Sequence, residues 1–389
     1  MTSVRRRFTA EARRARLGPR HLLTSATRAS TPEEVARALV ALHATDPATV
    51  FLAVAARTGT ASVAELERAL YEDHSLVRML CMRRTMFVLP TELAPVADAA
   101  AARAVAVRMR ADLAKVIGEQ LGFDARWFAA TEEAVLAALA ERGEATAAQL
   151  AEDVPDLKSQ IVMAAGKPYE AKPRITSRFL GVLAAEGRIR RGRPLGSWAS
   201  SQFRWTVAES HPELAADTAR TELAARYLDA FGPATTEDVK WWTGWTLTET
   251  RRALAGTEAV GVDLDEGPGH ALPHQLEPPP APEPWAALLP ALDPTPMGWR
   301  HRDWYLNAGH KAELFDKTGN IGPSVWWNGR IVGGWAQRPD GEIVTRVFED
   351  VGAAAERAVD AEAARMAEFF GDVRIRPSFR TPLERGLCA

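Results

Sequence analysis

The stretch that most constrains the fold runs from Thr131 to Val207, where helical and strand-like patterns follow one another in a fixed order. Apolar residues at helical spacing predict a helix that begins near Thr131, a short second helix from Thr146 and a third that ends at Gly187. Two strand-like runs around a Gly-, Pro- and Ser-rich turn then predict a hairpin. Three helices followed by a two-stranded wing are the order of a winged helix.

The downstream segment repeats this plan. Helices are expected to begin near Thr221, Thr235 and Thr246, because each residue offers a hydroxyl that can cap the free N–H groups of a first helical turn. A strand is expected at 259–264. This order predicts another winged unit.

The upstream segment offers the same elements. Ser30 or Thr31 can cap a helix that has Pro32 at its first position. A second helix is expected within 62–77, and the residues at 76–90 resemble a hairpin. Three winged units in tandem are therefore the simplest description of the first 275 residues.

The pattern changes after the proline cluster at 276–284, which marks a boundary. Three strand-like runs within 325–348 are separated by turn residues, and this predicts an antiparallel meander. A helix at about 352–370 and a last strand at 373–376 are expected to follow.

Together these patterns predict an α+β fold, mainly α, with three tandem winged-helix units and a C-terminal antiparallel β/α cap. The expected units cover residues 1–130, 131–208, 209–275 and 285–389.

Composition places the chain among globular proteins. Hydrophobic residues make up 47% of the 389 residues and charged residues 25%, and no run of about twenty apolar residues could span a membrane. Cys81 and Cys388 suit neither a disulfide framework nor a zinc site. We therefore expect a cytoplasmic protein without a metal, a cofactor or an obligate protein partner. Three fused winged units favour a monomer, because tandem fusion supplies what a dimer otherwise would.

Arginine is concentrated in the middle unit. Seven arginines on the expected recognition helix and wing stand against Glu186 alone: Arg174, Arg178, Arg188, Arg190, Arg191, Arg193 and Arg204. These parts of a winged helix meet the phosphates and groove edges of double-stranded DNA. Ser177, and Arg83 and Arg84 of the upstream hairpin, complete the expected DNA-binding set. The alternatives are a solvated arginine-rich surface and a protein-interaction module.

Other notable residues favour structural roles. Trp241, Trp242 and Trp245 could stack on bases, but their spacing on one short helix favours a core anchor. Asp293 precedes a proline, a position where aspartate usually forms a turn. The sequence contains no glycine-rich phosphate loop and no Ser-His-Asp order.

A polar stretch interrupts apolar sequence at residues 43–47. If the helix from Pro32 extends to about Leu42, His43 lies on a short connector beyond its end. One interpretation is structural: His43 and Thr45 bind the last helical carbonyls, and Asp46 caps the next helix. The other interpretation is that these side chains carry chemistry.

Several segments match a known family in order along the chain. They are LVALHATDPATVFLAVAARTG, the 76–90 hairpin, RITSRFLGVLAAEGRIRRGR, LLPALDPTPMGWRHR and VWWNGRIVGGW. In these segments the chain resembles the tandem winged-helix DNA glycosylases of the bacterial AlkZ and YcaQ type. The resemblance implies three winged helices that scaffold a cationic surface for duplex DNA. It also implies excision of alkylated purines, including those in interstrand crosslinks, for DNA repair or for self-resistance to a genotoxin.

The catalytic signature of that family is glutamine, an apolar residue, and then glutamine or a related polar residue. The matching positions here are His43, Ala44 and Thr45, so both flanking residues depart from the pattern. A cationic alkylpurine is a good leaving group, so the enzyme mainly positions water and stabilises the sugar cation. A neutral His43 can accept a proton from that water. Thr45 is shorter than glutamine, and the adjacent Asp46 could supply charge as an accessory group.

Two hypotheses from different classes follow. The first is a monofunctional DNA glycosylase with His43 as the water-positioning base and Thr45 as the second polar group. The second is a non-catalytic DNA-binding protein on the same scaffold, acting as a regulator or as a shield over lesions. Only the pair at 43 and 45 separates them, because the arginine-rich surface supports both.

Overall fold

The computed structural model describes residues 5–59, 62–209, 211–280 and 283–389. These residues form fifteen α-helices and twelve β-strands, with four antiparallel sheets, which agrees with the expected mixture of helix and strand. Among the described helices, none is both long and apolar enough to cross a membrane.

The N-terminal part combines four helices with a three-stranded sheet of order β1-β3-β2. Its elements are α1 (Ala10–Arg20), α2 (Pro32–Ala38), β1 (Leu42–His43), α3 (Pro47–Ala55), α4 (Val63–Tyr71), β2 (Leu76–Leu80) and β3 (Met86–Pro90). Thr31 caps α2 as predicted. The expected extension of this helix to Leu42 is wrong. Val40 adopts a left-handed φ of 64°, so the helix ends and the chain joins the sheet as β1.

A long connection leads to the middle part. Its elements are α5 (Ala94–Ala97), a π-helical turn (Asp98–Ala102), α6 (Arg103–Leu121), α7 (Ala125–Arg142), α8 (Ala147–Asp153), α9 (Thr176–Ala185), β4 (Ile189–Pro194) and β5 (Phe203–Val207). The predicted helix start at Thr146 and the predicted hairpin are confirmed, and Thr146 caps the helix. The expected start at Thr131 is wrong, because the Asp124 carboxylate accepts the N–H groups of Arg126 and Trp127 and starts α7 earlier.

The third part repeats the order of helices followed by a hairpin. Its elements are α10 (Ala216–Phe231), β6 (Ala234–Thr235), α11 (Thr236–Thr243), α12 (Leu247–Ala255), β7 (Val260–Leu264) and β8 (Gly267–Ala271). Thr235 and Thr246 form the caps that the sequence predicted, each within a reciprocal capping box. The expected helix start near Thr221 is wrong, because that residue lies inside α10.

The C-terminal part is built on a four-stranded sheet of order β12-β11-β10-β9. Its elements are β9 (Ala286–Leu289), α13 (Lys311–Leu314), β10 (Ser324–Trp327), β11 (Arg330–Gln337), β12 (Ile343–Val347), α14 (Ala353–Phe370) and α15 (Pro382–Leu387). The predicted meander is confirmed. The expected strand at 373–376 is wrong: the N–H of Ile375 donates to the Gln337 side chain instead of to a neighbouring strand.

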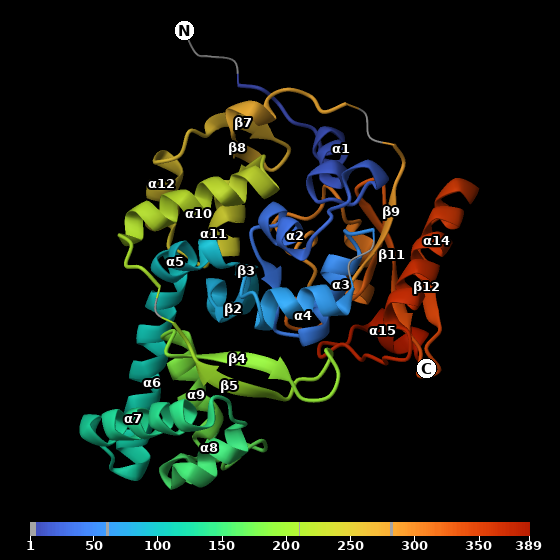
Figure 1. The fold of residues 1–389 in the computed structure, drawn as a ribbon. Helices are drawn as coiled ribbons and strands as arrows, with labels where there is room; N and C mark the ends of the chain where they lie inside the picture. The colour runs from blue at the N-terminus through green and yellow to red at the C-terminus, as the bar shows by residue number, and fades with distance from the viewer. Residues whose placement is uncertain (1–4, 60–61, 210, 281–282) are drawn as a thin grey trace.

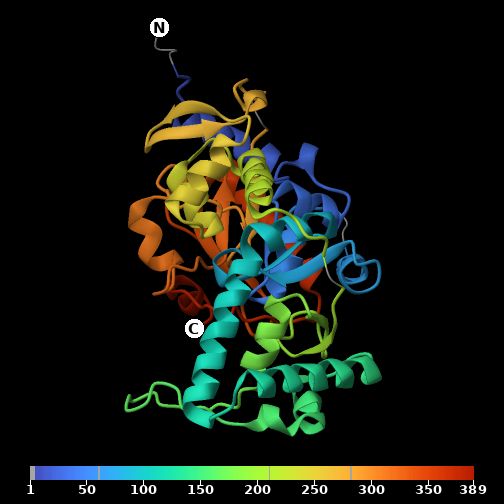
Figure 2. The same ribbon diagram turned by 90° about the vertical axis from the view of Figure 1, so that its left-hand side faces the viewer.

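Helix α6 separates two regions in space. The N-terminal, third and C-terminal parts lie together at one end, whereas α7, α8 and α9 form a lobe at the other end (Figure 1, Figure 2). The β4–β5 hairpin runs from this lobe back beneath α4. Its loop places Trp198 against Phe51 of α3 and Phe369 of α14, so the hairpin is anchored in the larger region.

A buried ion pair ties the N-terminal and C-terminal parts together. Arg57 donates to both carboxylate oxygens of Asp293 at 2.7 and 2.8 Å, and both side chains are fully buried. The remaining guanidinium hydrogens reach Thr295 and the carbonyls of His21 and Ala53. Asp293 also accepts the N–H of Thr295, as predicted for a turn former. The pair is therefore a structural connection and not an exposed site.

Candidate active site and nucleic-acid interface

His43 lies on edge strand β1, opposite Phe87 of β3. Its side chain is only 6% exposed and meets the Phe87 ring edge-on, with 5.3 Å between the ring centroids. Nδ1 is buried and has no hydrogen-bond partner among the described residues. Burial, followed by the positive charge of Arg83, lowers the pKa of His43 to about 3. The imidazole is therefore neutral at pH 7, and its unprotonated nitrogen can accept a hydrogen bond.

Thr45 and Asp46 lie in different environments. Thr45 is exposed, whereas the Asp46 carboxylate is buried and accepts the N–H of Ala48 at 3.1 Å and that of Ser378 at 2.8 Å. Asp46 thus caps α3, as the structural interpretation predicted, and also holds the C-terminal segment. The expectation that His43 and Thr45 bind the carbonyls of the preceding helix is wrong, because that helix ends at Ala38.

Arg83 and Arg84 form the tip of the β2–β3 hairpin. Both have left-handed backbones, with φ of 54° and 60°, which non-glycine residues adopt only where the surroundings hold them. Arg84 is exposed, whereas Arg83 is half-buried and its Nε has no partner among the described residues. The guanidinium of Arg83 stacks on the Trp241 ring, 4.2 Å from its centroid. Burial, followed by the charge of Arg302, lowers the pKa of Arg83 to about 10.

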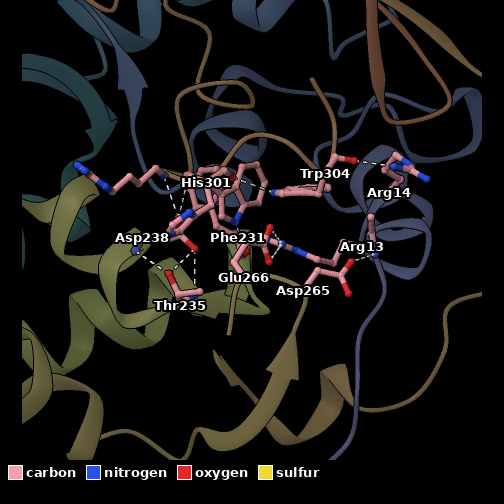
Figure 3. A network of polar contacts seen from close by, with 12 residues as sticks. Arg13, Arg14, Phe231, Thr235, Asp238, Asp265, Glu266, His301 and Trp304 are labelled. Carbon is pink, nitrogen blue, oxygen red and sulfur yellow. Dashed lines mark hydrogen bonds and ion pairs between the residues drawn. The ribbon is translucent and has the colours of Figure 1, made fainter. Parts of the chain in front are cut away.

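Helix α11 organises this region. Trp242 and Trp245, on α11 and just after it, are buried as predicted, but Trp241 is half-buried and meets a second guanidinium, that of Arg302, at 4.9 Å. One turn before Trp241, Asp238 accepts the N–H groups of Arg300 and His301 at 2.9 and 3.0 Å. Figure 3 shows Asp238 between Thr235 and His301. Asp238 thus fixes the backbone that carries Arg302 beside Trp241.

The arginines of the β4–β5 wing do not stand against Glu186 alone, so that expectation is wrong. Acidic residues from other elements meet them: Arg188 pairs with Glu132, Arg204 with Glu144, and Arg193 with Glu67 of α4 and with Glu72 just after it. Glu186 itself pairs with Arg110. Arg191 stacks on Phe203 at 4.3 Å, and Arg190 contacts His74 at 3.1 Å. Much of the wing's charge is therefore engaged within the protein.

Three residues of the predicted DNA-binding set remain exposed near the start of α9. Arg174 precedes the helix, and Ser177 and Arg178 lie in its first turn. Neither arginine forms an ion pair with any residue that the structure describes, and Arg178 contacts the Met163 sulfur at 3.0 Å. The structure thus separates this exposed group from the engaged arginines of the wing.

Comparison with known proteins decides the family. The sequence profile of a family described as DNA glycosylase AlkZ-like matches residues 36–369, most of the chain. The chain belongs to the AlkZ-like DNA glycosylase family. The resemblance of its ordered segments to this family is therefore confirmed.

One relative of this AlkZ-like chain is the interstrand DNA cross-link repair glycosylase of Streptomyces sahachiroi. The two are 29% identical over 167 residues, which cover 41% of this chain and 45% of the relative, so the alignment spans less than half of that protein. The solved structure of Streptomyces sahachiroi DNA glycosylase AlkZ is 23% identical, with a TM-score of 0.69. This match covers 94% of the present chain and 97% of the other. The two structures share a fold.

Sequence reasoning about this AlkZ-like chain missed Asp238 and Arg302. The capping pattern from Thr235 to Asp238 is visible in the sequence, but the contact of Asp238 with residues 300–301 joins distant segments. Arg302 ends the LLPALDPTPMGWRHR segment, which marked the family without indicating a role for this arginine. Among the residues the structure describes, no group of three His, Cys, Asp or Glu side chains is placed to hold a metal ion.

Proposed function

We propose that this chain is a monofunctional DNA glycosylase that hydrolyses the N-glycosidic bonds of alkylated purines in double-stranded DNA. The observation that carries the proposal is the neutral imidazole of His43, whose buried Nδ1 has no hydrogen-bond partner among the described residues. By the resemblance of the sequence segments, His43 stands where the family has its first catalytic polar residue. A buried nitrogen without a partner is costly in a folded protein and is commonly found where a substrate or a water binds. Membership of the AlkZ-like family supports the same reaction class.

The proposed reaction needs no general acid to protonate the leaving base. The glycosidic bond breaks with its electron pair moving to the cationic base, which leaves as a neutral purine, and the sugar becomes an electron-deficient cation. Water attacks this carbon and loses a proton to His43, from which it passes to solvent. Because its pKa is about 3, His43 is a weak base. We therefore assign it the orientation of the water and the acceptance of a proton late in the reaction, after the bond to the base has largely broken.

Thr45 and Asp46 take different parts in the proposal. The hydroxyl of Thr45, exposed two residues after His43, is proposed as the second polar group on the water or sugar. Asp46 directs both carboxylate oxygens to backbone N–H groups. Its accessory role is therefore to fix the backbone after Thr45, and not to contact the substrate.

We propose double-stranded DNA as the partner. The repeated order of helices and hairpins supports three winged-helix units, with boundaries near residues 130, 208 and 275. Arg83, Arg84, Arg174 and Arg178 form no ion pair with the residues that the structure describes, and this supports contacts with phosphates. Because one relative acts in interstrand cross-link repair, we propose that crosslinked purines belong to the substrate class.

The test is incubation of the purified chain with a duplex that contains one N7-alkylguanine, followed by alkaline cleavage at abasic sites. The proposal expects strand cleavage at the lesion, and no cleavage in a matched duplex with unmodified guanine. Departure from glutamine at both His43 and Thr45 also favours a second candidate, a DNA-binding protein without catalysis. A duplex that is bound without forming abasic sites would support that candidate and refute the glycosylase.

A further inference from the structure

Arg83 and Arg302, near the β2–β3 hairpin tip, differ from the many arginines of this protein that form ion pairs. In other parts of the chain, the guanidinium groups of Arg13, Arg142 and Arg346 pair with carboxylates at 2.5 to 2.8 Å. Arg83 and Arg302 have no carboxylate partner among the described residues, although both contact the same tryptophan. Two half-buried cations thus contact one ring, and neither forms an ion pair within the part of the chain that the structure describes.

The protein holds this arrangement from two sides. Gly244, with a φ of 77°, ends α11 and packs against the hairpin tip, where an added Cβ would lie 3.2 Å from the backbone nitrogen of Arg83. Asp238 of the same helix fixes the backbone just before Arg302. Helix α11 therefore carries Trp241 and also positions both cations, Arg83 through the contact at Gly244 and Arg302 through Asp238. Holding like charges together costs free energy, which a bound anion would offset.

A cavity of about 290 Å³ opens beside the hairpin tip. Its charged lining consists of four arginines and two carboxylates: Arg83, Arg84, Arg108, Arg220, Asp112 and Glu249. Glu249 already pairs with Arg220 at 2.9 Å. The net charge of the lining is positive. Because a water molecule takes roughly 30 Å³ of liquid volume, the cavity has room beside Arg83 for an anion the size of a phosphodiester group. Arg302 and Trp241 lie outside its lining, so the cavity adjoins the pair of guanidinium groups on the Arg83 side.

The position of Arg83 identifies the anion. Arg83 lies at the tip of the hairpin that carries Phe87, and the Phe87 ring contacts that of His43, so the charge of Arg83 acts on the imidazole. Each deoxyribose in DNA is flanked by phosphates, and a sugar placed at His43 brings one of them toward the hairpin tip. Arginine suits this contact because its planar fork binds phosphate oxygens while its face stacks on an aromatic ring. Two guanidinium groups already contact Trp241, and this disfavours its use as a platform for a base.

We propose that Arg83 and Arg302, held on Trp241, bind the DNA phosphate next to the nucleotide whose sugar lies at His43. This inference rests on the proposed function, because it places the reacting sugar at His43. It assigns a binding role to Arg302 and a positioning role to Trp241 and Asp238.

The test measures binding, so that it stays independent of catalysis. The probe is a duplex with one tetrahydrofuran abasic-site analogue, which cannot be excised. In a series of probes, one phosphate near the analogue is replaced by an uncharged methylphosphonate. We expect one position at which the methylphosphonate weakens binding by the wild-type chain about tenfold, in line with the loss of one charge-assisted contact.

The Arg302→Gln variant should weaken binding of the unmodified probe by a similar factor and lower the slope of log K against log salt by about one. The methylphosphonate should then cost this variant less than it costs the wild type at the same position, because only Arg83 still contacts the phosphate. Arg302→Lys should restore the salt slope, because it keeps the charge, but should restore the affinity only in part. Circular dichroism checks that each variant is folded.

Arg346→Gln is the matched control, because Arg346 also stacks on an aromatic ring, that of Phe348, but pairs with Glu313. It should bind like the wild type. A wild-type chain that tolerates methylphosphonates at every position, or an Arg302→Gln variant with the wild-type salt slope, would overturn the inference. A chain that shows the phosphate effect but never excises a base would refute the proposed function and leave the phosphate site in place.

Discussion

Lowering the pH tests the electrostatic state of His43. Burial and the charge of Arg83 hold its pKa at about 3, so the imidazole should stay neutral between pH 8 and pH 5.5. An exposed histidine with a pKa of about 6.5 would be only about 9% neutral at pH 5.5, and a rate that depends on the neutral form would fall about tenfold. We expect the excision rate to change less than twofold over this range.

The assay is single-turnover excision of N7-alkylguanine with enzyme in excess, so that binding and product release do not limit the rate. The His43→Gln variant is the control, because glutamine does not titrate in this range and occupies this position in the family signature. Circular dichroism at pH 5.5 confirms that both proteins are folded. A wild-type rate that falls about tenfold with an apparent pKa near 6.5, while His43→Gln stays flat, would refute the argument that burial keeps His43 neutral.

Three further predictions concern stability. Asp293→Ala leaves the Arg57 guanidinium buried and unpaired, so the free energy of unfolding measured with denaturant should fall by about 3–5 kcal/mol; a loss below about 1 kcal/mol would contradict the buried pair. The folded-state pKa values of His21 and His43 lie near 3, below their unfolded values, so stability is complete above pH 6.5 and is lost as the pH falls toward 3. Each histidine contributes up to about 1.4 kcal/mol per pH unit to the dependence of the unfolding free energy on pH. In denaturant titrations at a series of pH values, His43→Gln should therefore reduce the slope of this free energy against pH by about that amount. An unchanged slope would argue against burial of a neutral His43 ring. Asp46→Ala should lower the free energy of unfolding by about 1–2 kcal/mol, because α3 loses its cap, and should leave the single-turnover excision rate within about twofold. A large loss of rate with normal stability would instead indicate a direct catalytic role for Asp46.

The sequence predicted elements whose causes are local. Caps at Thr31, Asp46, Thr146 and Thr235 depend on hydrogen bonds within three residues, so their helix starts are visible in the sequence. The same reasoning failed at Thr131, where an earlier aspartate supplies a cap of its own. Local capping therefore identifies possible helix starts, but competition between neighbouring caps decides which one is used.

The environment of the site depends on contacts between distant segments. The sequence identified His43, but its burial follows from pairing with Phe87, and its low pKa from burial together with a hairpin arginine. Similarly, the sequence around the wing looks strongly basic because the carboxylate partners are distant in the chain. The partners of Arg193, for example, are Glu67 in α4 and Glu72 just after it. The family signature indicated the position of the chemistry, whereas tertiary contacts set its electrostatics.

The central claim is that His43 takes part in cleavage of the glycosidic bond. Single-turnover excision of N7-alkylguanine from duplex DNA by the wild type and by His43→Ala tests it most directly, with Arg346→Gln as the matched control. We predict that the wild type and the control form abasic sites at similar rates, and that His43→Ala is at least about tenfold slower with unchanged DNA affinity. A His43→Ala variant that excises the base at the wild-type rate would contradict the account.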